Sequence, residues 1–317
     1  MTSQNIMSNT SPLAKRIFDI IQDVFDLFVI FVQIALEIFK TTVDKFLPRE
    51  LKDVSGEIVL ITGAGHGIGR ELVMQYVANH STVICVDINE KNTEETLQKA
   101  KALKKGSVHS YICDVSNRKA VLEMAAQVKR DIGPVSILVN NAGIMPTQPL
   151  DKQTEEDIRR TFEVNVFAHF WTLEAFLPHM KEQNRGHIVA VSSMTGLVGM
   201  SNLVPYSGTK YAVRGIMEAL QIELHEGPYK NLIKFTTIYP YAVDTGLCES
   251  IQSRFPSFLA MLDPKYVARK IIKAQRLELA NLSLPPYMQH LNNWARLLPF
   301  RCSILLFDYM NCAVGCK

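Results

Sequence analysis

The middle of the chain alternates short apolar runs with longer segments of helical character. The runs are "EIVLITG" (57–63), "STVICVD" (81–87), "SVHSYICD" (107–114), "VSILVNNAG" (135–143), "GHIVAVSS" (186–193) and "NLIKFTTIYP" (231–240). They are apolar rather than alternating, which is typical of strands that are covered on both faces. Because a helix-length segment separates each pair, we predict an α/β fold with a doubly wound parallel sheet in a single domain.

The N-terminal segment has a different pattern. Residues 17–39 read "IFDIIQDVFDLFVIFVQIALEIF" and are mostly Ile, Leu, Val and Phe. On a helix, most of the polar side chains would gather within roughly one 80° stripe. The residues of this stripe are Asp19, Asp23, Asp26, Gln33 and Glu37. The pattern predicts a very apolar helix with one narrow acidic edge.

Such a helix suits a membrane surface better than a membrane interior. About 20 residues can just span a bilayer, but each Asp at mid-bilayer costs ~2.5–3.5 kcal/mol. A helix that lies in the interface avoids this cost, and Lys15, Arg16, Lys40 and Lys45 flank the segment and suit anionic headgroups. We predict a membrane-associating helix within residues 1–50. The alternatives are a spanning helix and a soluble helix that packs on a partner subunit.

The first apolar run leads into a glycine-rich turn, "TGAGHGIG" (62–69), which opens a helical segment. Glycine lets the backbone approach a phosphate, and a helix N-terminus offers free N–H groups and a positive dipole end. The predicted cofactor contacts in this turn are Thr62, Gly63, Gly65, Gly67, Ile68 and Gly69. The turn predicts dinucleotide binding in a Rossmann-type fold.

The end of the second run indicates which dinucleotide binds. Asp87 lies about 20 residues beyond the turn, where a carboxylate can bond the ribose hydroxyls of NAD. The same charge would repel the 2′-phosphate of NADP, whereas His66 argues faintly for NADP. We predict NAD as the cofactor and Asp87 as the residue that selects it.

A candidate catalytic pair lies in "VPYSGTKYAVRG" (204–215), where Tyr206 and Lys210 are one helical turn apart. A free tyrosine has a pKa near 10 and is a poor base, but a nearby ammonium favours the phenolate. Ser193 ends the fifth run at the sheet edge where ligands bind, and Ser192 would point to the opposite face. We therefore predict that Tyr206 moves the proton in a hydride transfer and that Ser193 holds the substrate oxygen.

Composition narrows the function classes further. The 317 residues are 47% hydrophobic and 21% charged, with a net charge of +3, so nothing indicates a nucleic-acid partner. The six cysteines are scattered, without a Cys-x-x-Cys pair or a metal-ligand spacing. We expect neither a metal site nor a disulfide framework, which is typical of a domain that faces a reducing compartment.

Together these motifs resemble those of the short-chain dehydrogenase/reductase family over about residues 55–285. The matching pieces are "TGAGHGIG", "NNAG" (140–143), Asn165 in "FEVNVFAHF", Ser193 and "YSGTK" (206–210). The resemblance implies that Tyr206 is the catalytic acid/base and that Lys210 lowers its pKa and bonds the nicotinamide ribose. It also implies that Ser193 orients the substrate oxygen and that Asn165 holds a water of a proton relay.

The resemblance implies further cofactor contacts and an oligomeric state. The contacts are Asp114 and Val115 beside the adenine, Asn141, Ala142 and Gly143 along the ribose, and Thr245 at the cofactor amide. After "IYP" the family usually has glycine, whereas this chain has Tyr241, so the shape of that loop is left open. Members of the family often pair through long helices, which implies a homodimer.

A closer resemblance is to the branch that holds lipid-droplet 17-beta-hydroxysteroid dehydrogenases and epidermal retinol dehydrogenases. It rests on "TGAGHGIGR", "VDIN" (86–89), "TFEVNVFAHFWTLEAFLPHM" (161–180) and the apolar N-terminal helix. The branch implies NAD-dependent turnover of a retinoid, steroid or similar lipid at the endoplasmic reticulum or a lipid droplet, with the catalytic domain facing the cytosol.

The resulting division of the chain is a membrane-associating helix (1–50), a catalytic domain (51–290) and an apolar tail (291–317). Residues 246–264, here called the substrate loop, would cover the substrate, and the tail could form a second membrane-facing helix. An NADP-dependent carbonyl reductase is the alternative enzyme, and Asp87 argues against it. A sugar-nucleotide epimerase would have differently spaced glycines. A non-catalytic scaffold of membranes or droplets is the alternative of another class, against which Asn165, Ser193, Tyr206 and Lys210 argue.

Overall fold

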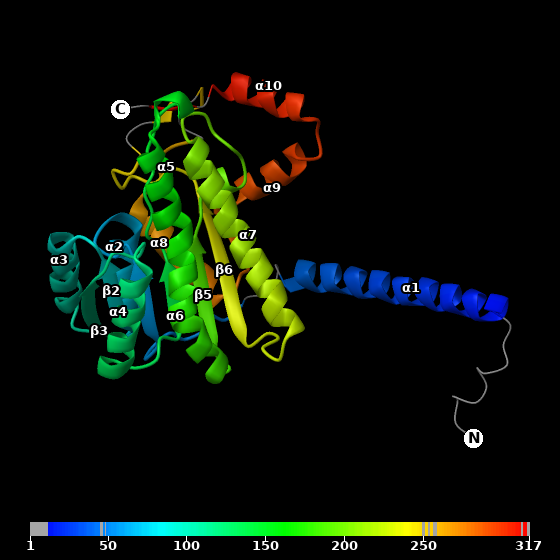
Figure 1. The fold of residues 1–317 in the computed structure, drawn as a ribbon, viewed down its shortest axis with the longest axis horizontal. Coiled ribbons are helices and arrows are strands. Elements are labelled where there is room, and N and C mark those ends of the chain that lie inside the picture. The colour runs from blue at the N-terminus through cyan, green and yellow to red at the C-terminus, as the bar shows by residue number, and fades with distance from the viewer. Residues whose placement is uncertain are drawn as a thin grey trace. The chain divides into compact units, whose positions relative to one another are not determined.

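The computed structural model describes residues 12–44, 47, 49–248, 251–252, 254–255, 259–311 and 313–315. The chain divides into two compact units, Met1–Glu50 and Leu51–Lys317. The first unit contains one long helix, and the second contains all the β-strands (Figure 1).

The helix of the first unit is α1, Pro12–Asp44, which is longer than the apolar stretch that predicted it. Lysine, arginine and threonine flank that stretch, and they continue the helix at little cost on either side. The large apolar side chains of α1 are exposed, for example Phe28 at 64%. Among the described residues, no helix combines the length and apolarity needed to cross a membrane.

The second unit is built on seven parallel strands in the order β3-β2-β1-β4-β5-β6-β8. Their bounds are β1 Ile58–Thr62, β2 Thr82–Asp87, β3 Ser107–Ile112, β4 Ile137–Asn140, β5 Gly186–Val191, β6 Ile233–Pro240 and β8 Asn281–Leu284. The doubly wound parallel sheet is thereby confirmed. The predicted runs cover six of the strands, whereas β8 was missed because "NLSL" is short and half polar.

Helices cover both faces of the sheet. One face carries α4 (Arg118–Asp131), α5 (Glu155–Phe162), α6 (Ala168–Glu182) and α7 (Val204–Glu226), which stand in front of the strands in Figure 1. The other face carries α2 (Gly67–Ala78), α3 (Glu90–Lys101) and α8 (Pro264–Arg276). Alternate residues of β1 serve the two cores: Leu60 packs toward α4, α6 and α7, whereas Val59 and Ile61 pack toward α2, α3 and α8. This double burial explains why the strand sequences do not alternate.

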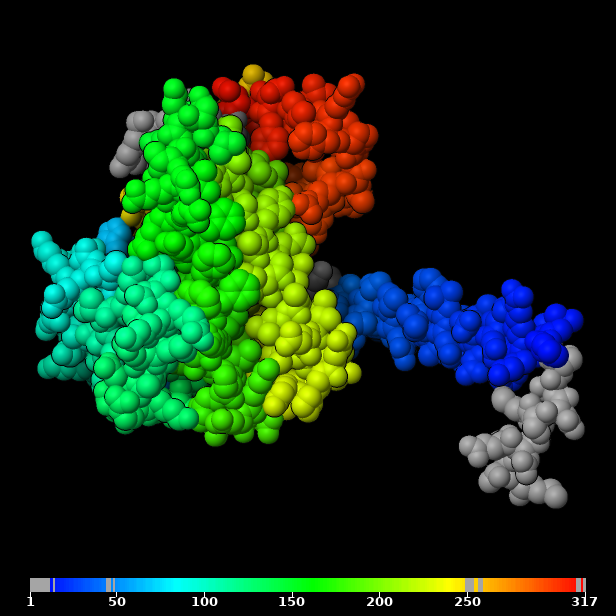
Figure 2. All heavy atoms as spheres, in the orientation of Figure 1, coloured from blue at the N-terminus to red at the C-terminus, as the bar shows by residue number. Residues whose placement is uncertain are grey.

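The C-terminal part of the second unit adds α9 (Tyr287–Ala295) and α10 (Phe300–Met310). Two short strands, β7 (Ile251–Gln252) in the substrate loop and β9 (Ala313–Val314) in the tail, pair antiparallel. The atoms of α9 and α10, red in Figure 2, lie at the surface, and Trp294, Leu297 and Phe300 are more than 70% exposed. The tail therefore contacts the substrate loop and still presents apolar side chains outward.

Candidate active site

The cavity of the catalytic unit lies at the carboxyl edge of the sheet and has a volume of about 590 Å³. Residues that follow β1, β2, β4, β5 and β6 line it, together with residues of α7. Ligands of open α/β sheets bind at this edge, because the strand order reverses between β1 and β4 there. The cavity therefore lies where the glycine-rich turn, Asp87, Ser193 and Tyr206 were expected to meet, and each of these four lines it.

The glycine-rich turn leaves no space for side chains at three positions. Gly63 has a φ of +66°, and a Cβ there would lie 2.9 Å from Ala142 Cα. A Cβ on Gly67, whose φ is +55°, would lie 2.8 Å from Thr245 Cγ2, and one on Gly69 would lie 2.0 Å from the Gly63 oxygen. The turn thus leads its backbone tightly into the N-terminus of α2, as phosphate binding requires.

Thr62 and Asn141 hold the glycine-rich turn through hydrogen bonds. The Thr62 hydroxyl accepts hydrogen bonds from the backbone N–H groups of Asn141 (3.0 Å) and Ala142 (3.1 Å). The Asn141 amide donates to the carbonyl oxygens of Thr62 (2.9 Å) and Gly63 (3.2 Å). Thr62 is buried outside the cavity lining, whereas Asn141, Ala142 and Gly143 line it. The pair therefore joins the end of β1 to the end of β4.

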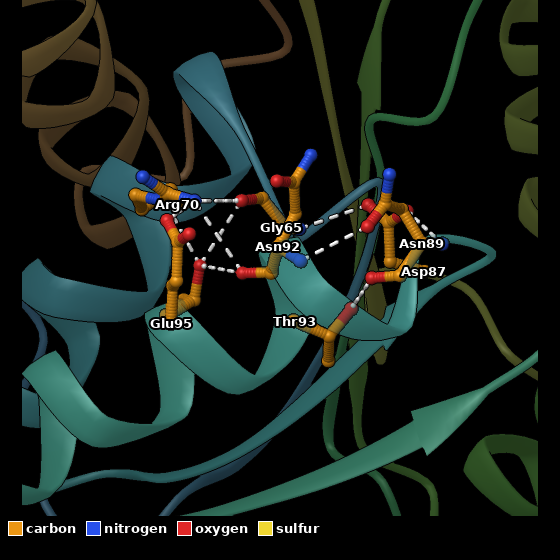
Figure 3. Close-up of polar contacts among 8 residues, drawn as sticks. Gly65, Arg70, Asp87, Asn89, Asn92, Thr93 and Glu95 are labelled. Atoms are coloured by element: carbon orange, nitrogen blue, oxygen red, sulfur yellow. Dashed lines mark hydrogen bonds and ion pairs between the residues drawn. The ribbon is translucent and has the colours of Figure 1, made fainter.

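Asp87 ends β2 and lines the cavity beside the turn (Figure 3). Its Oδ2 accepts a hydrogen bond from the Gly65 N–H (2.8 Å), and its Oδ1 accepts one from the Asn89 N–H (2.9 Å). Two backbone donors thus fix the plane of the carboxylate. An oriented carboxylate at this place can accept hydrogen bonds from a ribose diol.

The two residues expected beside the adenine lie outside the cavity lining. Asp114 binds Ser116 through Oδ1 and Arg160 through Oδ2 (3.0 Å), and Val115 is buried in the core. Burial acts to raise the pKa of Asp114, but the hydrogen bonds from Ser116 and the ion pair with Arg160 outweigh it and lower that pKa. Asp114 therefore stays ionised and ties the end of β3 to α5.

Tyr206 and Lys210 share one face of α7, as their spacing predicted, and Lys210 Nζ lies 5.5 Å from the centroid of the Tyr206 ring. Both side chains are buried against the cavity, and Nζ donates to the Val191 carbonyl (3.0 Å). Ser193 follows β5 and hydrogen-bonds the phenol of Tyr206, whereas Ser192 donates to the Lys210 carbonyl (2.9 Å). The two serines thus point to different partners, as expected from strand alternation.

The pKa values of this group run opposite to the simple expectation for Tyr206. Burial raises the pKa of Tyr206 to about 12, and the hydrogen bond with Ser193 offsets part of that rise. Burial also lowers the pKa of Lys210 to about 8. In the protein chain alone, desolvation therefore outweighs the attraction between ammonium and phenolate from which a lowered Tyr206 pKa was predicted.

Asn165 lies in a π-helical turn (η4, Glu163–Phe167) between α5 and α6. Its side chain pairs with the backbone of Ile144, accepting from the N–H (2.8 Å) and donating to the carbonyl (2.9 Å), and also donates to the Thr209 hydroxyl (3.2 Å). The amide thereby connects the loop after β4 to α7. π-helical turns often occur at functional sites, and the relay water expected of Asn165 stays a prediction, with the side-chain amide already bonded to Ile144 and Thr209.

The matched family model is that of the short chain dehydrogenases, over residues 57–254. The chain belongs to the short-chain dehydrogenase family. It is 37% identical to epidermal retinol dehydrogenase 2 of Homo sapiens over 284 residues, 90% of this chain and 92% of the relative. It is 39% identical to human estradiol 17-beta-dehydrogenase 11 over 279 residues, with coverage of 88% and 90%.

Solved structures confirm the fold of this dehydrogenase. A short-chain dehydrogenase/reductase from Burkholderia phymatum, solved in complex with NAD, superposes with a TM-score of 0.68 at 24% identity. The match covers 76% of this chain and 93% of that one. Both the family and its retinol and steroid branch were therefore identified correctly from the motifs.

The residues that line the dehydrogenase cavity but belong to no sequence motif are mostly apolar. They include Met145, Met194, Thr195, Met200, Leu203, Tyr241, Ala242 and Val243. Scattered methionines carry no motif, so their meeting follows only from the fold. Of the substrate loop, Gly246, Leu247 and Cys248 line the cavity, while 249–250, 253 and 256–258 lie outside the described residues.

Tyr241, the departure from the family's glycine, fits its loop without a left-handed backbone. Its φ is not among the positive values of the chain, so a side chain is tolerated there. The ring packs beside Met194, Leu197 and Tyr239, and the N–H donates to the Leu284 carbonyl (2.8 Å). The loop after β6 is thus held by β8, and Thr245 keeps its place in the cavity against Gly67.

Proposed function

We propose that this protein is an NAD-dependent oxidoreductase that transfers a hydride between NAD and a lipophilic alcohol or ketone. The observation that carries the proposal is the meeting of Ser193, Tyr206 and Lys210 in one cavity with the glycine-rich turn and Asp87. The turn, with no room for side chains at Gly63, Gly67 and Gly69, fits the phosphates of a dinucleotide.

NAD, when bound, supplies the nicotinamide ring that accepts or returns the hydride. The chain supplies the proton chemistry at the substrate oxygen. Tyr206 takes the hydroxyl proton during oxidation, and Ser193, its hydrogen-bond partner, holds the same oxygen. Lys210 contributes positive charge beside the phenol, and positive charge lowers the free energy of the phenolate that Tyr206 becomes. Because burial keeps the pKa of Tyr206 at about 12 with Lys210 already in place, the charge of Lys210 is one contribution to the phenolate and not its whole cause.

Asn165 and Gly143 fit a route by which the proton leaves Lys210. A Cβ on Gly143 would lie 3.3 Å from Asn165 Oδ1 and 3.6 Å from Lys210 Nζ, so these three groups meet at one point of the site. Because the Asn165 side chain is occupied by Ile144 and Thr209, the relay water would be held by the backbone of the π-helical turn.

The substrate is proposed to be a retinoid, a steroid or a similar lipid. The cavity lining includes Met145, Met194, Met200 and Leu203, which offer apolar contact and few hydrogen bonds. Methionine adapts its shape to bulky hydrocarbon ligands. The names of the relatives point the same way, since they are retinol and estradiol dehydrogenases.

We also propose that the protein associates with the endoplasmic reticulum or a lipid droplet, with its catalytic unit in the cytosol. The acidic stripe of α1 and its apolar remainder suit a helix that lies in the interface. The tail offers a second contact, because Trp294, Leu297 and Phe300 are exposed in α9, α10 and the turn between them. Flotation of the full chain with lipid vesicles tests the membrane association. If the triple variant Trp294→Ser, Leu297→Ser and Phe300→Ser still binds the vesicles, the tail is not needed for that association.

A homodimer is part of the proposal and is supported by family resemblance. Phe167 and Phe170 around the start of α6 and Ile222 on α7 are exposed on the helices that would pair. Light scattering of the full chain in detergent should give a protein mass of twice the chain mass, and a monomer under all conditions would contradict it.

The decisive test is turnover of a substrate panel. Purified protein with NAD is given retinols, steroids and fatty alcohols, and NADH formation is followed, with Tyr206→Phe as the matched control. Turnover of at least one lipid that Tyr206→Phe abolishes is the expected result. NAD binding without turnover on any alcohol would favour the scaffold, and a preference for NADP would favour the carbonyl reductase.

A further inference from the structure

Arg70, in the first turn of α2, is the last residue of "TGAGHGIGR" and has no role among the predicted site residues. Its side chain is 16% exposed and lies between the glycine-rich turn and α3 (Figure 3). Nε and Nη2 both donate to the Gly65 carbonyl, at 3.0 and 2.6 Å. The same two nitrogens reach α3, donating to the Thr96 hydroxyl (3.0 Å), the Asn92 carbonyl (3.4 Å) and Glu95 Oε2 (3.3 Å). One guanidinium thus joins the turn to the helix that follows Asp87.

The residue that Arg70 holds is the one that orients Asp87. The Gly65 carbonyl accepts hydrogen bonds from Arg70 and from the Thr96 hydroxyl. The Gly65 N–H donates to Asp87 Oδ2 (2.8 Å). The space on this side is tight, because a Cβ on Gly65 would lie 3.0 Å from Asp87 Oδ2 and 3.0 Å from Asn92 Cβ. The backbone of Gly65 is therefore held at its carbonyl by Arg70 and, one peptide group earlier, bonds the Asp87 carboxylate through its N–H.

The opposite side of Asp87 is tied to α3 as well. Asp87 Oδ1 accepts from the Asn89 N–H, and Asn89 is the N-cap of α3, whose side chain accepts from the Asn92 N–H (3.0 Å). Arg70 bonds Asn92, Glu95 and Thr96 of that helix. The two backbone donors of Asp87 are thus connected through α3, to which Gly65 is joined by Arg70 and by the Thr96 hydroxyl.

We propose that Arg70 is a positioning residue for cofactor selection: by clamping the Gly65 peptide to α3, it aims the Asp87 carboxylate at the adenosine ribose. Arginine suits this place because its planar fork holds one carbonyl with two N–H groups and still reaches a neighbouring helix. Lysine, with a single nitrogen, can make only part of the clamp. The proposal rests on the proposed function in one respect, the preference for NAD.

The test compares dinucleotide affinities without substrate. The dissociation constants of NAD and NADP are measured by calorimetry on the parent chain, Arg70→Met, Arg70→Lys and Glu95→Gln. The last variant is the matched control, since it removes only the outer ion pair and leaves both bonds to Gly65. Each variant is also checked for an unchanged thermal transition and for kcat at saturating NAD.

Arg70→Met is expected to raise the dissociation constant of NAD about tenfold, because the bonds that orient a charged group are lost. The dissociation constant of NADP should change much less, so the NAD-to-NADP ratio falls, while kcat stays within about twofold. Arg70→Lys should fall between the parent and Arg70→Met, and Glu95→Gln should match the parent. In an Asp87→Asn background, Arg70→Met should no longer change the ratio.

Three outcomes would overturn the proposal. If Arg70→Met loses NAD and NADP affinity equally, Arg70 has only a structural role. If neither affinity changes, Arg70 has no role in cofactor binding. If Arg70→Met does not fold, Arg70→Lys serves instead, and an unchanged ratio of NAD to NADP affinity in Arg70→Lys refutes the proposal. A parent that does not prefer NAD would refute the proposed cofactor itself, which is distinguishable because it is seen before any substitution is made.

Discussion

Acidification should destabilise the catalytic unit through two buried histidines, His169 of α6 and His187 of β5. His187 Nε2 contacts the Thr236 hydroxyl (2.8 Å), and its Nδ1 faces the Gln275 amide nitrogen (3.3 Å), which leaves the ring one proton to donate. Burial lowers the pKa of His169 to about 3, and the charge of Lys210 acts in the same direction. Burial also lowers the pKa of His187 to about 3, against the opposing effect of Glu278. Both rings are therefore neutral in the folded chain.

The size of the effect follows from proton linkage. An unfolded histidine has a pKa near 6.5, so between pH 6.5 and 3 the unfolded chain binds one more proton per ring than the folded chain. The stabilising contribution is complete above pH 6.5, and it is lost as the pH falls below that value. At pH 5 the loss is ~2 kcal/mol for each ring, a considerable part of a typical stability of about 5–15 kcal/mol.

Urea unfolding of the parent chain and of His187→Gln, at pH 7.5 and pH 5.0, checks this prediction. The free energy of unfolding should fall between the two conditions by ~2 kcal/mol less in His187→Gln, because one titrating ring has been removed. His290→Gln, at an exposed position of α9, should keep the parental pH dependence. Equal losses in the parent and in His187→Gln would show that the buried ring does not titrate as its surroundings demand.

Three further predictions concern the site. Tyr206→Phe should lower kcat/KM at least about a hundredfold with NAD affinity retained, since only proton transfer is removed; stopped-flow NADH formation measures it, and a parental rate would exclude the phenol. Gly69→Ala should abolish NAD binding, because the new Cβ would lie 2.0 Å from the Gly63 oxygen. Gly215→Ala, which has open space around it in α7, is the control and should bind NAD normally. Calorimetry measures both affinities, and retained NAD binding in Gly69→Ala would contradict the tight packing of the turn. Asp87→Ser should narrow or invert the preference for NAD over NADP in kcat/KM, and an unchanged ratio would remove Asp87 from cofactor selection.

The sequence predicted most of the sheet and the meeting of the proposed catalytic groups in one cavity, because both depend on local patterns. Strands buried on both faces are apolar throughout, and a spacing of four residues places Tyr206 beside Lys210 whatever surrounds them. The spacing of residues does not show how deeply the fold buries each side chain. The raised pKa of Tyr206 depends on how deeply the fold buries the phenol, which no local motif encodes.

Roles that depend on distant contacts were also beyond the sequence. Thr62 and Asn141 belong to a glycine-rich turn and an "NNAG" motif, but the structure uses their polar groups to join β1 to β4. The expected place of Asp114 beside the adenine stays a prediction, and the bond of its carboxylate to Arg160, which lies 46 residues away, could be seen only in the structure. β8 has too few apolar residues for a strand to be predicted from its sequence. It lies at the sheet edge because it pairs with β6.

The pairing between β7 and β9 has a consequence for engineering the specificity of this enzyme. Arg254 of the substrate loop donates its N–H to the Met310 carbonyl (3.0 Å), its guanidinium lies over the Tyr309 ring, and the Phe255 ring contacts that same tyrosine. The described parts of the substrate loop and of the tail are therefore joined through backbone and ring contacts. A chimera that borrows only the loop from a relative would inherit mismatched partners, so loop and tail should be exchanged together.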